Sequence, residues 1–176
     1  LQLGLRGTSI KELRHGESTV AAPRAVAQLA GKVVTAVAAG GRGLDGGHTA
    51  FAVRGAQGDE LWTCGHGRWG QLGLRAFKHV SEPGLVKTLS ELREYDEAAG
   101  QVRAIQIRQV ACGERHTAAV LGTGNVFVWG WNDKGQLGTE SGQGVHTPTM
   151  LKSPAELRFT PLRHVCCGPN STSVWS

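Results

Sequence analysis

The chain has 176 residues, which is enough for one compact core but too few for two large domains. Its 26 glycines follow no G-X-Y period, which excludes a collagen-like chain and indicates turns or close packing. Its formal charge of +5 is spread thinly along the sequence, so nucleic-acid binding, which concentrates Lys and Arg on one element, is unsupported.

The first residues read "LQLGLRG" and match neither the charged-then-apolar plan of a signal peptide nor the acid-free plan of a transit peptide. Residues 2–4 ("QLG") instead repeat the end of a motif found twice further along. No apolar run approaches the ~20 residues that span a bilayer, so we expect no transmembrane segment. A targeting segment, if the protein has one, is expected upstream of these residues.

The next two segments predict consecutive antiparallel strands. Residues 37–53 ("VAAGGRGLDGGHTAFAV") and 61–73 ("LWTCGHGRWGQLG") alternate small and apolar side chains and are bounded by glycine. The second segment contains G-x-G-x-x-G, the glycine spacing of a dinucleotide-binding loop. That kind of site needs a helix directly after the loop, and residues 71–74 show no helical period, so we expect no cofactor.

Residues 77–107 differ from the repeated segments and are interpreted as an insertion. Within them, "LREYDE" and "QVRAIQI" flank the turn-like "EAAG", which predicts an extra β-hairpin. A helix over "SELREYDEAAG" is the alternative. Glu94, Tyr95 and Asp96 lie on this hairpin and are candidate partner contacts, because variable loops on a rigid scaffold commonly carry binding.

A second copy of the strand segments begins at Val110. Residues 110–120 ("VACGERHTAAV") repeat the first half, and residues 126–138 ("VFVWGWNDKGQLG") align with residues 61–73 without gaps. In the glycine-rich turn only the middle glycine changes, from Gly67 to Asn132, and both residue types tolerate positive φ. We therefore interpret the glycines as turn geometry. The side chains that these two turns present are further candidate partner contacts: Arg68, Trp69, Trp131, Asp133 and Lys134.

Residues 139–162 are interpreted as an exposed loop, in which Pro148 and Pro154 block strand pairing. Residues 165–175 ("VCCGPNSTSVW") then give a third copy of the first half of the motif. A unit of short strands that recurs at a fixed period is typical of a β-propeller blade. We place the units at residues 1–36 (partial), 37–109, 110–164 and 165–176 (partial), with insertions at 77–107 and 139–162.

The four cysteines fit the repeat without a metal site. Cys112, Cys166 and Cys167 occupy slots that hold alanine in other copies, and Cys64 aligns with Trp129. No C-x-x-C spacing is present, so we expect no metal and interpret these residues as buried, reduced thiols.

The histidines give no catalytic constellation. His48 and His116 share one slot of the repeat, where the third copy has Ser171. This exchange predicts a polar group that forms a hydrogen bond at the start of a strand. No acid or nucleophile lies at a telling spacing from the other histidines, so we expect no catalytic residue and no enzyme activity.

The motifs V-x-x-G-x-x-H-T-A-A-V and V-F-V-W-G-W-N-D-K-G-Q-L-G resemble the regulator-of-chromosome-condensation repeat family, whose members form seven-bladed β-propellers. The order of "HVSEP", "VKTLSEL" and "EYDE" is similar to that of fungal mitochondrial members linked to assembly of the cytochrome bc1 complex. The resemblance implies an all-β fold with about two and a half to three blades in this chain. At about 55 to 65 residues per unit, seven blades need roughly 350 to 450 residues, so we expect the remaining blades from the same or another chain.

The resemblance implies a non-enzymatic interaction or assembly scaffold whose partner is a protein within a large complex, such as a mitochondrial respiratory complex or ribosome. The mitochondrion is therefore the expected compartment, with the nucleus or cytoplasm as alternatives. The second hypothesis is a guanine-nucleotide exchange factor for a small GTPase, in which the hairpin over residues 92–107 displaces the phosphate region. Association with chromatin or RNA is the third.

Overall fold

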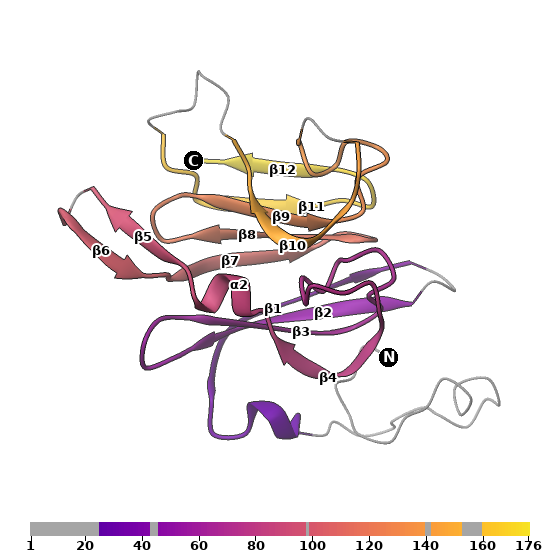
Figure 1. Ribbon diagram of the computed structural model, residues 1–176, viewed down its shortest axis with the longest axis horizontal. Helices are drawn as coiled ribbons and strands as arrows, with labels where there is room; N and C mark the ends of the chain where they lie inside the picture. Colours follow the sequence, from indigo (N-terminus) through magenta and orange to yellow (C-terminus); the bar gives the residue numbers. More distant parts are fainter. Residues whose placement is uncertain (1–24, 43–45, 98, 140–141, 153–159) are drawn as a thin grey trace.

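The computed structural model describes residues 25–42, 46–97, 99–139, 142–152 and 160–176. Within these ranges, two four-stranded sheets and a two-stranded sheet are stacked in the order of the sequence, and a second two-stranded sheet forms a separate hairpin (Figure 1). We call the three stacked sheets blade 1, blade 2 and partial blade 3. No helix among the described residues is long and apolar enough to cross a bilayer.

Blade 1 is a meander in which each strand pairs with the next along the chain. After the 3-10 helix η1 (Ala27–Leu29), its strands are β1 (Val33–Gly41), β2 (Gly47–Arg54), β3 (Glu60–Gly65) and β4 (Val80–Leu85). Ala50 on β2 lies opposite Ala38 on β1 and Thr63 on β3. Ala50 and Thr63 are fully buried, because small side chains on this face allow the next blade to approach.

Blade 2 repeats this meander, and partial blade 3 repeats its beginning. The strands of blade 2 are β7 (Ile107–Cys112), β8 (His116–Leu121), β9 (Val126–Gly130) and β10 (Val145–Met150), and those of partial blade 3 are β11 (His164–Cys167) and β12 (Thr172–Trp175). All pairs of neighbouring strands are antiparallel. The predicted all-β propeller architecture is therefore confirmed over the described residues.

The fourth strand of each complete blade comes from a segment that the sequence interpretation treats as an insertion. β4 pairs with β3, and β10 pairs with β9 through Val145–Gly130 and Thr149–Val128. The expectation that Pro148 blocks strand pairing is therefore wrong. β10 is the edge strand of its sheet and its register is irregular between Val145 and Thr149, which is where a sheet tolerates proline. Pro154 lies outside the described residues.

The predicted hairpin lies between blade 1 and blade 2 in the sequence. Its strands β5 (Arg93–Asp96) and β6 (Gln101–Ala104) pair in antiparallel register, which confirms the hairpin and shows the helical alternative to be wrong. The short helix α2 (Lys87–Ser90) ends before the hairpin begins. Figure 1 shows the hairpin projecting sideways from the stacked sheets.

The V-x-x-G glycines allow the first strands of neighbouring blades to approach closely. β1 contacts β7, and β7 contacts β11. A Cβ atom on Gly40 would collide with the carbonyl oxygens of Gly113 and Cys112, and one on Gly113 would lie 2.8 Å from the carbonyl oxygen of Gly168. Only a residue without a side chain fits at these positions.

Two apolar cores fill the spaces between the blades. The core between blades 1 and 2 includes the side chains of Trp129, Leu61 and Leu89, all fully buried. The core between blade 2 and partial blade 3 is built from shorter side chains such as Val128 and Val165. Each blade therefore depends on its neighbour for the burial of one face, as expected for a repeat architecture.

Candidate protein-interaction surface

The two glycine-rich turns have the same backbone conformation. In each turn, three glycines at equivalent positions have positive φ, which confirms the interpretation of these residues as turn geometry. The angles are +107°, +80° and +68° at Gly65, Gly70 and Gly73, and +113°, +73° and +61° at Gly130, Gly135 and Gly138.

The expectation that Gly67 and Asn132 replace each other because both adopt positive φ is wrong, because neither residue has positive φ. A Cβ atom on Gly67 would collide with the carbonyl oxygen of Lys78, so blade 1 needs glycine for space. In blade 2 the buried Asn132 side chain is a hydrogen-bonding group. Its Oδ1 accepts the backbone N–H of Leu137 at 2.9 Å, and its Nδ2 donates to Thr139 Oγ1 at 3.0 Å.

The glutamine of G-Q-L-G closes each turn with its side chain. Gln71 Oε1 accepts the backbone N–H of Trp69 at 2.9 Å, and Gln136 Oε1 accepts that of Lys134 at 3.0 Å. Each turn is therefore fixed from within, and the side chains that it presents are held in place.

Each blade joins the next through a threonine. Thr117 Oγ1 of blade 2 donates to the carbonyl oxygen of Gln71 in blade 1 at 2.7 Å, and Thr172 donates to Gln136 in the same way at 2.7 Å. Trp129 Nε1 also donates to the Gln71 carbonyl, at 2.9 Å. These threonines were missed in the sequence interpretation, although both follow the His48-type slot of the repeat.

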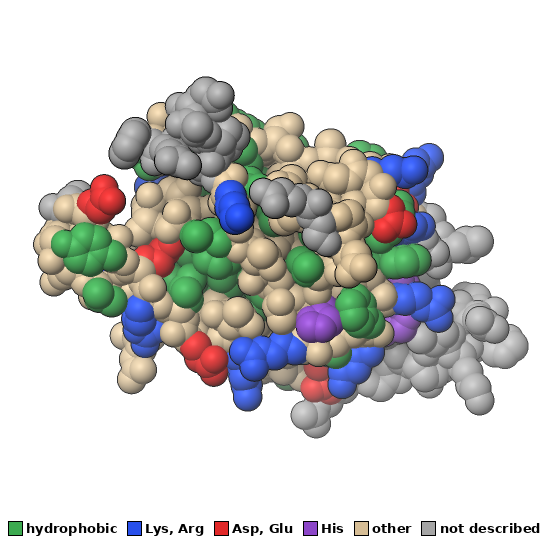
Figure 2. Space-filling model, turned by 45° about the horizontal axis from the view of Figure 1, so that its top comes forward, with side chains coloured by type: hydrophobic (Ala, Val, Ile, Leu, Met, Phe, Trp, Pro, Cys, Tyr) green, Lys and Arg blue, Asp and Glu red, His purple; other side chains and the backbone are tan. Residues whose placement is uncertain are grey.

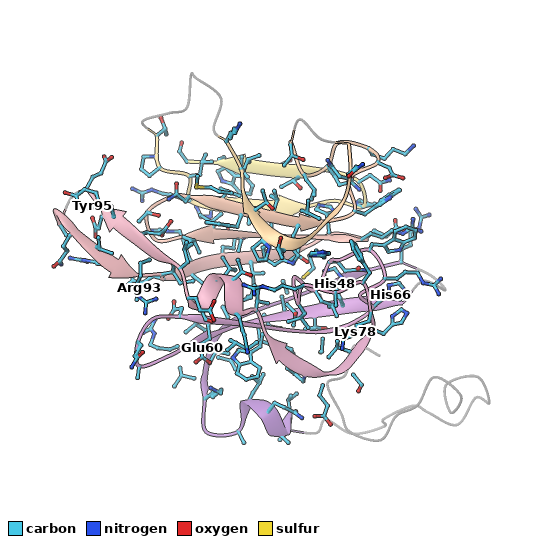
Figure 3. All side chains as sticks on the ribbon, in the orientation of Figure 1. His48, Glu60, His66, Lys78, Arg93 and Tyr95 are labelled. Atoms are coloured by element: carbon cyan, nitrogen blue, oxygen red, sulfur yellow. The ribbon has the colours of Figure 1, made fainter. Side chains whose placement is uncertain are left out.

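The paired histidines complete this network. His48 Nε2 lies 2.7 Å from Thr117 Oγ1, and His116 Nε2 lies 3.0 Å from Thr172 Oγ1, which confirms their hydrogen-bonding role. Each threonine hydroxyl already donates its hydrogen bond to a carbonyl oxygen, so it acts as the acceptor toward histidine. The histidine Nε2 atom is therefore protonated and donates the hydrogen bond. Figure 3 shows His48 between the blades. Burial lowers the pKa of His48 to about 3 and that of His116 to about 4, which keeps both rings neutral near pH 7.

Two of the cysteines, Cys112 and Cys167, contact the preceding blade and are weakly acidic. The thiols of Cys112 and Cys167 donate to carbonyl oxygens of the preceding blade at 3.5 and 3.6 Å. Burial raises the pKa of the Cys112 thiol, and raises that of Cys167 to about 12. Cys64 is buried as expected, whereas Cys166 is exposed. Among the described residues, no three His, Cys, Asp or Glu side chains form a group that could hold a metal ion.

The turns of the two blades meet around one arginine. The Arg115 guanidinium carbon lies 5.0 Å from the Trp69 ring centre and 4.9 Å from that of Trp131. The two rings are 5.9 Å apart, so Arg115 lies against both aromatic rings. Arg115 was not among the predicted residues. The other candidates on these turns, Arg68, Asp133 and Lys134, are exposed.

The hairpin carries the second group of candidates. Tyr95 and Val102 lie directly opposite each other and are 61% and 66% exposed. Asp96 forms an ion pair with Arg103 across the hairpin at 3.2 Å. Glu94 is buried.

Glu94 anchors the hairpin to the turn between β8 and β9. Its two carboxylate oxygens accept hydrogen bonds from Thr123 Oγ1 at 2.8 Å and from Asn125 Nδ2 at 2.6 Å. The geometry gives Glu94 a positioning role, whereas Tyr95 is open to a partner. Partner contact by any of the eight candidate residues stays a prediction.

Family comparison agrees with this repeated geometry. The model described as the regulator of chromosome condensation (RCC1) repeat matches residues 59–120 and 123–175, and a second model of the same repeat matches residues 107–136. The chain belongs to the RCC1 repeat family.

Curated relatives share this repeat. The RCC1-repeat chain is 32% identical over 116 residues to the human probable E3 ubiquitin-protein ligase HERC4, with 65% of the chain and 10% of that protein covered. It is 28% identical over 195 residues to human RCC1 domain-containing protein 1, with 93% of the chain and 49% of that protein covered. The chain therefore spans about half or less of the length of these relatives.

Solved structures show the same fold. Human WBSCR16 is 27% identical with a TM-score of 0.55, and the match covers 80% of this chain and 30% of that one. Prp20p from Saccharomyces cerevisiae is 20% identical with a TM-score of 0.59, and the match covers 82% of this chain and 31% of that one.

The two groups of candidate residues are not brought together in the RCC1-repeat fold. Figure 3 shows Tyr95 at one end of the sheets and His66, close in sequence to the exposed Arg68, at the opposite end. They therefore form two separate surfaces, the hairpin and the paired turns. Each surface needs its own test.

Basic side chains do not gather into one surface on the face shown in Figure 2. Lys and Arg are dispersed there, and Asp and Glu lie among them. Binding to a nucleic-acid backbone relies on a continuous basic patch. This face of the RCC1-repeat chain therefore adds no support for association with chromatin or RNA.

Proposed function

We propose that this RCC1-repeat chain is a non-enzymatic protein-interaction scaffold and that its hairpin β5–β6 contacts the partner. One observation carries the proposal: the directly paired side chains of Tyr95 and Val102 are 61% and 66% exposed on a projecting hairpin. An exposed aromatic residue beside an aliphatic one is a typical anchor of a protein interface.

The anchoring of the hairpin supports this role. Glu94 joins it to Thr123 and Asn125, and Asp96 pairs with Arg103 within it. A binding element that is already held in one conformation loses less entropy when a partner docks. The buried histidines and thiols are used for contacts between blades, which favours a scaffold over an enzyme.

Affinity capture from cell extract tests the proposal. The variant Tyr95→Ser/Val102→Ser should lose captured proteins that the wild type retains. Met150→Ser is the matched control, because Met150 is 52% exposed on β10, which belongs to a different sheet from the hairpin. Equal capture by the wild type and the hairpin variant, with the fold retained, would rule out this surface.

The finer proposal is a role in assembly of a large mitochondrial complex. Its support is the resemblance of the variable segments to fungal mitochondrial members of the family. Protease protection of the protein in purified mitochondria, together with a reduced amount of one assembled complex after depletion, is the expected result. A protein found entirely in the nucleus or cytosol would contradict it.

The second candidate function is guanine-nucleotide exchange on a small GTPase. The projecting hairpin favours it, because a wedge is the kind of element that could displace a bound phosphate region. The structure of Prp20p is described together with its binding properties to Gsp1p and histones. A nucleotide-release assay over a panel of GTPases should show acceleration that Tyr95→Ser/Val102→Ser abolishes. No acceleration with any member would remove this candidate.

We further propose that additional blades, from the same or another chain, complete the ring. Val33 and Val37 on β1 are each 63% exposed, so this strand presents apolar side chains of the kind that another element covers. The 176-residue segment alone should therefore self-associate or unfold over a broad temperature range. A sharp transition of a monomer, measured by calorimetry and light scattering, would contradict this architecture.

A further inference from the structure

A cleft of about 700 Å³ opens where blade 1 meets the root of the hairpin. The turn at residues 54–59 forms one wall, residues 103–108 form the other, and Gly122 from the turn between β8 and β9 closes one side. Its volume lies within the ~300–1,000 Å³ range of ligand sites. Both blades contribute to the walls, so the cleft depends on the packing of one blade against the next.

Asp59 holds the two walls together. Its backbone N–H donates to the Ile105 carbonyl oxygen at 2.9 Å, and its Oδ2 accepts the backbone N–H of Ile107 at 2.8 Å. Asp59 is only 8% exposed. Gly58 adds a close contact, since a Cβ atom there would lie 2.6 Å from the Ala104 side chain. The shape of the cleft is therefore fixed before anything binds.

Three arginines and one aspartate supply the formal charges of the cleft walls. The side chain of Arg54 is 69% exposed, and its Nε atom lies 4.0 Å from Asp59 Oδ1, which makes a long and weak ion pair. The side chain of Arg103 is 49% exposed and forms the ion pair with Asp96 across the hairpin. Arg108 is exposed, and no ion pair joins it to a described residue. The cleft therefore has a positive excess whose guanidinium groups remain accessible.

We propose that this cleft binds an acidic peptide segment of a protein partner. Arginine recognises carboxylates through paired, charge-assisted hydrogen bonds, and Arg54 and Arg108, which line opposite walls, suit acidic side chains along one extended peptide. No aromatic side chain lines the cleft, so it has no platform for stacked nucleic-acid bases. The inference rests on the proposed protein-interaction role and names the chemistry of the partner.

Fluorescence anisotropy with the full-length protein tests the cleft directly. The probe is a labelled eight-residue peptide of alternating Glu and Gly, and the matched peptide of alternating Gln and Gly is its neutral control. Arg54→Gln/Arg108→Gln should weaken binding of the acidic peptide about tenfold. Arg42→Gln removes an exposed arginine outside the cleft and should weaken binding less than about twofold.

Three results would overturn the proposal: no binding of the acidic peptide, equal binding of the Gln–Gly peptide, or equal weakening by Arg42→Gln. Tighter binding of poly(U), lost in the double arginine variant, would assign the cleft to nucleic acid instead. Circular dichroism verifies that the variants fold. Partner capture through Tyr95 and Val102 is a separate readout, so loss of peptide binding with capture intact contradicts the cleft alone, and loss of capture with peptide binding intact contradicts the hairpin alone.

Discussion

The Nε2–H of His48 in blade 1 donates a hydrogen bond to Thr117 Oγ1 in blade 2 at 2.7 Å, and the Thr117 hydroxyl in turn donates one to the carbonyl oxygen of Gln71 in blade 1 at 2.7 Å. His116 and Thr172 repeat this arrangement at the next interface. The H-T-A and G-Q-L-G motifs are therefore two parts of one hydrogen-bond network. They recur together because every interface between blades needs both.

Replacement of Thr117 by valine should test the strength of this network. The variant keeps the shape of the side chain but leaves the buried His48 N–H without its acceptor. We expect the free energy of unfolding to fall by about 2–3 kcal/mol. Thr117→Ser retains the hydroxyl group and loses only a methyl group, at a cost of about 1 kcal/mol. Equal stability of the two variants in urea unfolding would contradict the role of the hydroxyl.

The buried histidines should make stability depend on pH. Burial lowers the pKa of His48 to about 3 and that of His116 to about 4, below the ~6.5 of an unfolded histidine. Above about pH 6.5 both states are neutral and the stabilising contribution is fully present. As the pH falls toward 4, the unfolded chain binds protons that the folded chain does not, so the free energy of unfolding falls.

The slope of this loss can be measured by urea unfolding between pH 7 and pH 4.5. Each histidine should contribute at most about 1.4 kcal/mol per pH unit. The double variant His48→Gln/His116→Gln should show a shallower slope, and the contributions of carboxylates cancel in the comparison. An unchanged slope would contradict the assignment of this pH dependence to His48 and His116.

The close approach of the first strands predicts a large effect of one methyl group. Gly40→Ala places a Cβ atom against the backbone carbonyl of Gly113, which cannot move without shifting β7. We expect the free energy of unfolding to fall by about 3 kcal/mol, which corresponds to a fall in Tm of about 6–12 °C. Gly142→Ala is the control, because a Cβ atom there meets nothing within 4 Å. Similar melting temperatures for the two variants would contradict the packing argument.

The repeat predicted the inner strands of each blade but not the outer one. β4 (VSEPGL) and β10 (VHTPTM) are edge strands with polar residues and a proline, so neither alternation nor β-propensity marks them. They share a V-x-x-P pattern at the same 65-residue offset that separates Leu61 from Val126. Extending the alignment by twelve residues would have identified both strands.

The candidate site was predictable only where local sequence determines exposure. The alternation of "LREYDE" with "QVRAIQI" was enough to predict the pairing that leaves Tyr95 exposed. The burial of Glu94 depends on Thr123 and Asn125, which are 29 and 31 residues further along the chain. Contacts across that separation depend on how the hairpin folds back onto blade 2, and no spacing rule contains this information.

Glu94 therefore gives a prediction that separates positioning from partner contact. Its carboxylate accepts hydrogen bonds from Thr123 and Asn125, so Glu94→Ala leaves two donors without their acceptor and releases the root of the hairpin. A loss of about 1.4 kcal/mol in local stability corresponds to about tenfold faster amide hydrogen exchange in β5 and β6. Exchange in β7–β9 should change much less.

Glu97→Ala is the control for this experiment, because Glu97 is exposed on the same hairpin. It should leave exchange in β5 and β6 unchanged. If Glu94 only positions the hairpin, Glu94→Ala should weaken partner capture less than Tyr95→Ser/Val102→Ser, because the apolar pair is still present. A loss of capture equal to that of the apolar variant, without faster exchange, would instead make Glu94 a direct contact.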